Sequence, residues 1–95
     1  MNKNINIEDK EFEILENEKE GFDLEELKTK YTDFYDVYDY ILGDWAYGKL
    51  RLKGFCEKTN KNFKKINDIS VKNEYIKENC AYNCKYFLIK RVYKK

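Results

Sequence analysis

The chain has 95 residues, a net charge of +1, and a composition rich in charged and aromatic side chains. This length fits one domain, residues 1–95, and leaves no room for a second. Because histidine is absent, the sequence excludes Ser-His-Asp and Cys-His nucleophile systems, HExxH metal sites and histidine pH switches. The four glycines never cluster, so a glycine-rich phosphate loop is excluded too.

The small net charge hides a division between the two halves of the chain. Residues 1–45 hold fourteen acidic residues against five lysines, a net charge of −9, and residues 46–95 hold fourteen basic residues against four acidic ones, +10. We favour the interpretation that the halves neutralise each other within one fold, because charge runs usually solvate a face. The alternative is a basic surface for nucleic acid and an acidic surface for another partner.

The chain carries no membrane or export signal. No apolar run approaches the ~20 residues of a membrane span, and the N-terminus has no apolar stretch of the signal-peptide type. We therefore expect a cytoplasmic protein with no membrane partner. In that compartment Cys56, Cys80 and Cys84 are expected to be reduced thiols.

The first third of the chain predicts two strands and a helix. Ile5 and Ile7 alternate with polar residues, as do Phe12 and Ile14, which indicates two short antiparallel strands. A helix is predicted over about residues 23–35, with Asp23 as its N-cap. Its apolar positions recur at helical spacing: Leu24, Leu27, Tyr31 and Phe34.

The middle of the chain predicts a hairpin. A strand over residues 38–43 is followed by a turn over residues 44–48 and a strand over residues 49–56, in which Leu50 and Leu52 alternate with charged residues.

A lysine-rich loop, residues 57–67, follows the hairpin and is the segment we expect to be most mobile, with the ends at about residues 1–4 and 94–95. Asp68 or Ser70 then begins a second helix, and residues 86–92 form a last strand. The order β-β-α-β-β-α-β predicts an α+β fold, with both helices packed on one face of a mainly antiparallel sheet.

The hairpin is specific enough to indicate a family. Residues 38–55 and the segment from Cys80 to Cys84, followed by Tyr86 and Phe87, resemble the two signatures of the YutD-like family, small uncharacterised proteins of Gram-positive bacteria and their relatives. The resemblance implies an α+β fold and a cytoplasmic bacterial protein, and it implies no activity. The signature positions are Asp39, Gly43, Asp44, Trp45, Gly48, Arg51, Gly54, Cys80 and Cys84. Ala46 and Asn83 depart from it, since glycine is expected at both.

Two groups of residues are candidate sites of chemistry. The acidic cluster of Asp33, Asp36, Asp39 and Asp44 could hold a paired-carboxylate site, but we favour a role in ending the helix and forming the turn. Cys80 and Cys84 could be redox or metal thiols, but their four-residue spacing differs from that of thioredoxin-like motifs, and a zinc site needs four ligands. No cofactor, metal or catalytic residue is therefore expected.

The candidate binding surface combines aromatic and basic side chains of the hairpin: Trp45, Tyr47, Lys49, Arg51 and Lys53. Such groups stack bases and neutralise phosphates, although a core position is favoured for Trp45 and a solvated strand face for Arg51 and Lys53. The leading function is a non-enzymatic binding module for RNA or a ribonucleoprotein. A protein-interaction adaptor is second, and a small thiol or metal enzyme is third.

Overall fold

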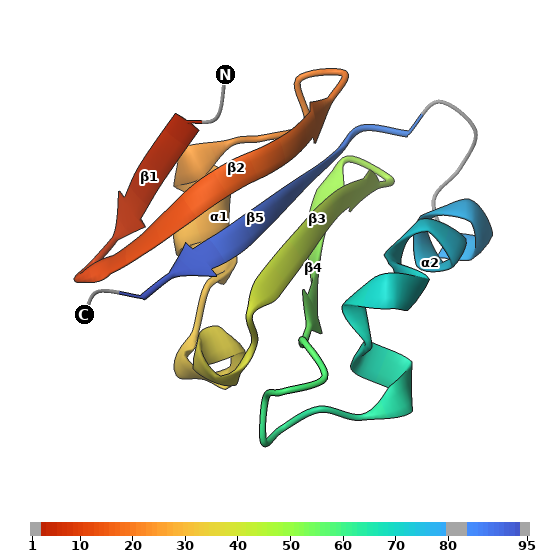
Figure 1. The fold of residues 1–95 in the computed structure, drawn as a ribbon. Coiled ribbons are helices and arrows are strands. Elements are labelled where there is room, and N and C mark those ends of the chain that lie inside the picture. Colours follow the sequence, from red (N-terminus) through yellow and green to blue (C-terminus); the bar gives the residue numbers. More distant parts are fainter. Residues whose placement is uncertain (1–2, 80–83, 94–95) are drawn as a thin grey trace.

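The computed structural model describes residues 3–79 and 84–93, which form a five-stranded antiparallel sheet with helices on both sides (Figure 1). The strands lie in the order β1-β2-β5-β3-β4. Their bounds are β1 (Lys3–Ile7), β2 (Lys10–Glu18), β3 (Tyr40–Ala46), β4 (Lys49–Phe55) and β5 (Tyr86–Val92). The predicted α+β class and the order of strands and α-helices are confirmed.

Two α-helices and three 3₁₀ helices connect the strands. The α-helices are α1 (Leu24–Lys30) and α2 (Lys72–Asn79), and the 3₁₀ helices are η1 (Asp33–Val37), η2 (Lys65–Asn67) and η3 (Ile69–Val71). Among the described residues, no helix is long and apolar enough to cross a membrane.

The two α-helices cover opposite faces of the sheet, so the prediction that both pack on one face is wrong. Leu27 of α1 packs in one core with Ile41 and Phe87, whereas Tyr75 of α2 packs against a second core that holds Leu42 and Leu88. Successive strand residues point to opposite faces. The neighbours Ile41 and Leu42 are both buried for that reason, and the central strands serve two cores.

The first helix begins as predicted and ends early. The Asp23 carboxylate accepts a hydrogen bond from the Glu26 backbone N–H at 3.1 Å, which confirms the cap. The helix stops at Lys30 because Tyr31 adopts an extended backbone and places its ring edge-on against Phe12. The predicted continuation is therefore the separate 3₁₀ helix η1, and Phe34 is exposed rather than buried.

The hairpin turn is tighter than predicted. Strand β3 continues to Ala46, and only Tyr47 and Gly48 form the turn, with φ of 54° and 74°. The strands extend this far because Asp44 pairs with Arg51 and Trp45 with Leu50 across the ladder. A two-residue turn with positive φ at both positions matches the right-handed twist of the flanking strands.

Candidate functional site

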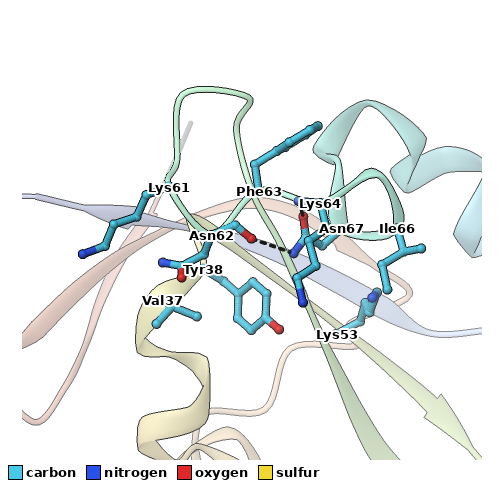
Figure 2. Close-up of a pocket in the computed structure, with 9 residues that line it drawn as sticks. All are labelled: Val37, Tyr38, Lys53, Lys61, Asn62, Phe63, Lys64, Ile66 and Asn67. Atoms are coloured by element: carbon cyan, nitrogen blue, oxygen red, sulfur yellow. Dashed lines mark hydrogen bonds between the residues drawn. The ribbon is translucent and has the colours of Figure 1, made fainter.

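A pocket of about 320 Å³ lies beyond the end of β4, where the 57–67 segment folds back over η1 (Figure 2). Lys61 projects on one side of it, and Lys53 and Ile66 lie on the other, with the Tyr38 ring between them (Figure 2). The lining residues are Val37, Tyr38, Lys53, Lys61, Asn62, Phe63, Lys64, Ile66 and Asn67.

Backbone hydrogen bonds hold the rim of the pocket to the sheet. The Cys56 N–H donates to the Asn67 carbonyl at 2.6 Å, and the Ile69 N–H donates to the Cys56 carbonyl at 3.0 Å. The buried Asn67 side chain accepts from the Lys64 N–H at 2.8 Å and donates to the Asn62 carbonyl at 3.3 Å. The segment predicted as a plain loop is therefore built on specific asparagine contacts.

Asp39 holds the beginning of the 57–67 segment in place. Its carboxylate accepts hydrogen bonds from the Glu57 N–H at 2.8 Å, from the Asn60 amide at 3.1 Å and from the Tyr93 hydroxyl at 3.2 Å. Burial and the neighbouring Asp39 charge both raise the pKa of Tyr93. Asp39 is thus a structural acceptor with three donors.

The pocket combines positive charge with exposed apolar surface. None of its three lysines forms an ion pair with another described residue, and no acidic side chain lines it. The Lys53 ammonium lies 5.6 Å from the centre of the Phe55 ring. Val37 and Ile66 remain 44% and 75% exposed.

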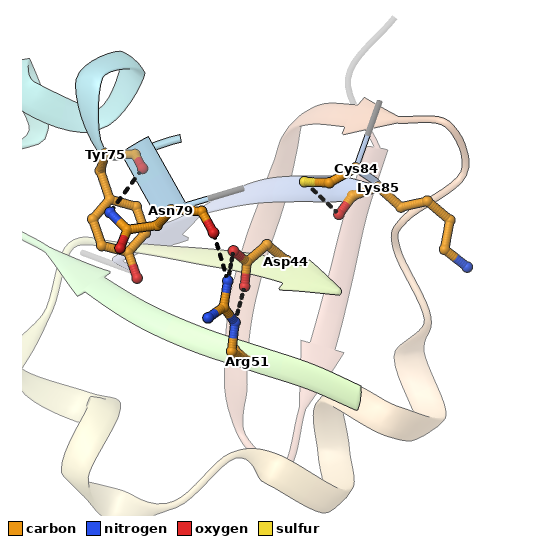
Figure 3. Close-up of polar contacts among 6 residues, drawn as sticks. All are labelled: Asp44, Arg51, Tyr75, Asn79, Cys84 and Lys85. Carbon is orange, nitrogen blue, oxygen red and sulfur yellow. Dashed lines mark hydrogen bonds and ion pairs between the residues drawn. The ribbon is translucent and has the colours of Figure 1, made fainter. Parts of the chain in front are cut away.

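Asp44 and Arg51 form a two-pronged ion pair across the hairpin (Figure 3). Arg51 Nε donates to Asp44 Oδ1 at 3.0 Å and Nη2 to Oδ2 at 2.7 Å, and Nη2 also donates to the Asn79 carbonyl at 3.0 Å. Asp44 is buried, and the hydrogen bond and charge of its carboxylate raise the pKa of Arg51. The guanidinium therefore joins both strands of the hairpin to the C-terminal end of α2.

The two aromatic residues near the hairpin turn differ in role. The Trp45 indole N–H donates to the Gly21 carbonyl at 2.7 Å, and its half-buried ring packs against the α1-side core beneath the Lys85 ammonium. Tyr47 is fully exposed, at 103% of its reference area. Its positive φ belongs to a region that side chains other than glycine, asparagine and aspartate rarely adopt.

Comparison with known proteins supports the resemblance seen in the hairpin. A family model described as "Putative antitoxin YutD-like" matches residues 6–90. The chain belongs to the YutD-like family. The curated protein "Putative antitoxin YutD" of Bacillus subtilis strain 168 is 47% identical over 90 residues, which cover 95% of this chain and 99% of that protein.

A solved structure extends the likeness to the fold. The solution NMR structure of protein yutD from B. subtilis aligns with a TM-score of 0.80 at 46% identity, covering 97% of this chain and 84% of that one. The expectation of a YutD-like α+β protein is therefore confirmed.

Several positions of the YutD-like signature have packing roles in this structure. A Cβ atom on Gly43 would lie 2.2 Å from the Phe87 ring, and one on Gly54 would lie 2.2 Å from the Tyr38 ring. Glycine at both positions therefore lets an aromatic ring lie directly on the sheet. Asp39 and Asp44 act as acceptor and ion-pair partner, and Trp45 as a hydrogen-bonded core residue.

The hairpin residues predicted as one binding surface of this YutD-like chain are divided between two faces. Lys49, Arg51 and Lys53 share the α2 face, as the alternation predicts, but Trp45 points to the α1 face with Leu50. It also lies within β3 rather than in the turn. The alternation of apolar and charged residues predicts which face each strand residue points to. It does not predict that Arg51 forms an ion pair with Asp44.

Three members of the acidic cluster, Asp36, Asp39 and Asp44, are engaged in hydrogen bonds within the fold. Asp36 accepts a hydrogen bond from Tyr31, and Asp39 and Asp44 have the structural partners described above. Burial raises the pKa of the Cys56 thiol, which is free. No group of three metal-ligating side chains occurs within residues 3–79 and 84–93.

Cys84 is disulfide-bonded, so the expectation of a reduced thiol at this position is wrong. That expectation rested on the compartment inferred from the absence of a membrane span or signal-type stretch, and on the odd number of cysteines. The Cys84 sulfur lies 3.6 Å from the Lys85 carbonyl oxygen, a close contact (Figure 3). Cys80, which was grouped with it, lies outside the described residues.

The pocket was not expected from the sequence. Its apolar residues are Val37, Phe63 and Ile66. In the sequence, each of them is an isolated apolar residue in a polar segment. The available signal was the spacing of Asn60, Asn62 and Asn67, because asparagine side chains often satisfy the backbone of a turn.

Proposed function

We propose that the protein is a cytoplasmic, non-enzymatic binding module that acts by docking onto a partner protein and restraining it. The curated relative carries the name "Putative antitoxin YutD", and a direct complex is the simplest means by which a small domain counteracts another protein. This gives the adaptor hypothesis precedence over RNA binding.

The observation that carries the proposal is Tyr47. A left-handed backbone costs an ordinary residue about 1–2 kcal/mol, and the exposed ring makes no packing contact that would offset this cost. Asparagine or glycine would form the same turn with less strain. Tyrosine is among the residues that contribute most to binding energy at protein interfaces, and a rigid turn presents it with little entropy to lose.

RNA binding through the hairpin has less support. Of the basic residues on the strand face, Arg51 is held by Asp44 and Asn79 and is not free to bind a phosphate. Trp45 is on the opposite face, so it could not stack on a base held by those cations. The proposal therefore keeps RNA as the alternative outcome.

Affinity capture from the native cell tests the proposal, with and without nuclease. We compare the wild-type protein with Tyr47→Asn, and use Lys19→Asn as the matched control because Lys19 also has a positive φ, of 53°, in an exposed turn. Loss of an interface tyrosine of this kind costs about 2 kcal/mol or more, which is roughly a 30-fold loss of affinity.

The expected result is a nuclease-resistant protein partner that Lys19→Asn and Tyr47→Phe retain and Tyr47→Asn loses. A partner that disappears on nuclease treatment would restore the RNA hypothesis. Equal capture by Tyr47→Asn and the wild type would contradict the role of the hairpin turn.

A further inference from the structure

The lysine-lined pocket beyond β4 is a second candidate site, separate from the hairpin turn. The turn precedes Lys49 and the pocket begins at Lys53, and a strand rises about 3.3 Å per residue. The two sites therefore lie roughly 15 Å apart along β4. The pocket shares no lining residue with the Tyr47 turn, so the two sites can bind different ligands.

The charge of the pocket favours an anionic ligand. Lys53, Lys61 and Lys64 bring three ammonium groups to its walls, and none has a carboxylate partner among the described residues. Asp39, which anchors the 57–67 segment, already accepts three hydrogen bonds and does not line the pocket. Like charges gathered without counter-charges attract an anionic ligand and are relieved by binding it.

The walls of the pocket favour an aliphatic neighbour to that anion over a nucleic-acid base, because Val37 and Ile66 are exposed whereas the Phe63 ring is partly buried. Val37 and Ile66 expose aliphatic surface at its edge. The Tyr38 ring could not serve as a stacking platform, because Gly54 lies against it on the sheet and Phe34 and Tyr35 pack around it. Arginine, whose planar group matches phosphate in two-pronged contacts, does not line the pocket.

We propose that this pocket binds an acidic side chain of an extended partner segment, with a neighbouring aliphatic side chain packed on Val37 and Ile66. The asparagine contacts of Asn62 and Asn67 hold the lysine-bearing loop in position before binding. A preformed site loses less conformational freedom when its ligand arrives.

The test uses a synthetic pentapeptide, acetyl-Glu-Leu-Asp-Leu-Glu-amide, titrated into the whole protein and followed by amide chemical shifts. The control peptide replaces each acid by its amide, and an oligouridylate of eight nucleotides is the nucleic-acid probe. We expect the acidic peptide to bind with a Kd below about 1 mM and to shift the amides of Val37, Phe63 and Ile66.

Substitutions then assign the contacts. Lys61→Gln with Lys64→Gln should lower the affinity for the acidic peptide about 10-fold and reduce the salt dependence of binding. Lys28→Gln with Lys30→Gln, at exposed positions of α1, should leave the affinity and its salt dependence unchanged. Ile66→Asn should lower the affinity for the acidic peptide by a similar factor. Tyr47→Asn should bind the peptide like the wild type, which separates this proposal from the one that rests on the turn.

Two results would overturn the proposal. One is equal affinity for the acidic and amide peptides, which would show that the lysines make no specific contact. The other is tighter binding of the oligouridylate with shifts at the same three amides, which would make the pocket a nucleic-acid site.

Discussion

At the scale of single residues, Arg51 contributes more to the fold than to a free basic surface. Its guanidinium bonds to a buried carboxylate on β3 and to the last carbonyl of α2. Its side chain is nevertheless 47% exposed, so water screens part of the interaction. Its energetic value therefore lies between that of a surface pair and that of a fully buried pair.

Arg51→Gln should accordingly lower the free energy of unfolding by about 2 kcal/mol, because the Asp44 carboxylate stays buried without its guanidinium. Urea denaturation measures this, and Lys49→Gln on the same strand face should change stability by less than about 0.5 kcal/mol. The double variant with Asp44→Asn should cost less than the sum of the single changes. Strict additivity would mean that the two side chains do not interact.

Tyr47 should show the opposite behaviour. Tyr47→Asn lowers the strain of the positive φ at this position, so it should raise the free energy of unfolding by about 1 kcal/mol. This corresponds to a rise in Tm of about 4–8 °C for a domain of this size. Lys19→Asn should raise it similarly. A destabilised Tyr47→Asn protein would show that the ring makes contacts within the fold.

At the scale of elements, local sequence patterns correctly predicted the start of α1 and the face of each strand residue. They did not predict the features that depend on contacts between distant parts of the chain. Asp23 and Glu26 lie three residues apart, so their cap can be read from the sequence. Whether α2 packs on the face of Leu42 or on the face of Ile41 depends on the strand order, which no local pattern encodes. The same holds for the pocket, which Val37 and Ile66 line together only after the chain has folded back.

The cap of α1 is testable on its own. Asp23→Ala removes the acceptor of the Glu26 N–H and should cost about 1 kcal/mol, whereas Asp23→Asn keeps an acceptor and should cost little. Chemical denaturation of both variants gives the difference. An unchanged midpoint for Asp23→Ala would contradict the cap.

Mobility in the lysine-rich segment should be uneven. The amides of Cys56 and Ile69 are bonded across the segment and should be protected, whereas those of Lys58 and Lys61, which have no backbone acceptor among the described residues, should exchange rapidly. Native-state hydrogen exchange followed by NMR measures this directly. Uniform protection from Lys58 to Ile69 would contradict the expected mobility.

At the scale of the whole molecule, contacts between the two oppositely charged halves are part of the fold. Glu16 forms an ion pair with Lys72, and Glu13 lies opposite Lys90 in the sheet. These contacts offset part of the charge division within the domain. The lysines of the pocket stand out because Lys53, Lys61 and Lys64 gather at one pocket that no acidic side chain lines.

Tyrosines on both sides of the sheet should make the protein sensitive to alkali. Burial and the Glu57 hydrogen bond raise the pKa of Tyr40 to about 12, and burial and Asp36 raise the pKa of Tyr31. An ordinary tyrosine titrates near pH 10. The unfolded chain therefore loses these protons first, and stability should be fully present below about pH 10 and fall as the pH rises through 12.

Urea midpoints at pH 8, 10 and 11 test this, together with phenolate absorbance of the folded protein. Tyr40→Phe removes the titrating hydroxyl and should make the decline above pH 10 shallower. A midpoint that is constant from pH 8 to 11 would contradict the raised pKa values.

The position of β5 also has a consequence for synthesis of the protein. The last strand of the chain lies between β2 and β3 (Figure 1), so the hairpins β1–β2 and β3–β4 share no ladder until it is inserted. A nascent chain on the ribosome therefore holds two unjoined half-sheets, and the domain closes only after residues 86–92 have emerged. The same geometry makes β5 a natural breakpoint for a split protein, in which a short synthetic strand restores an otherwise incomplete chain.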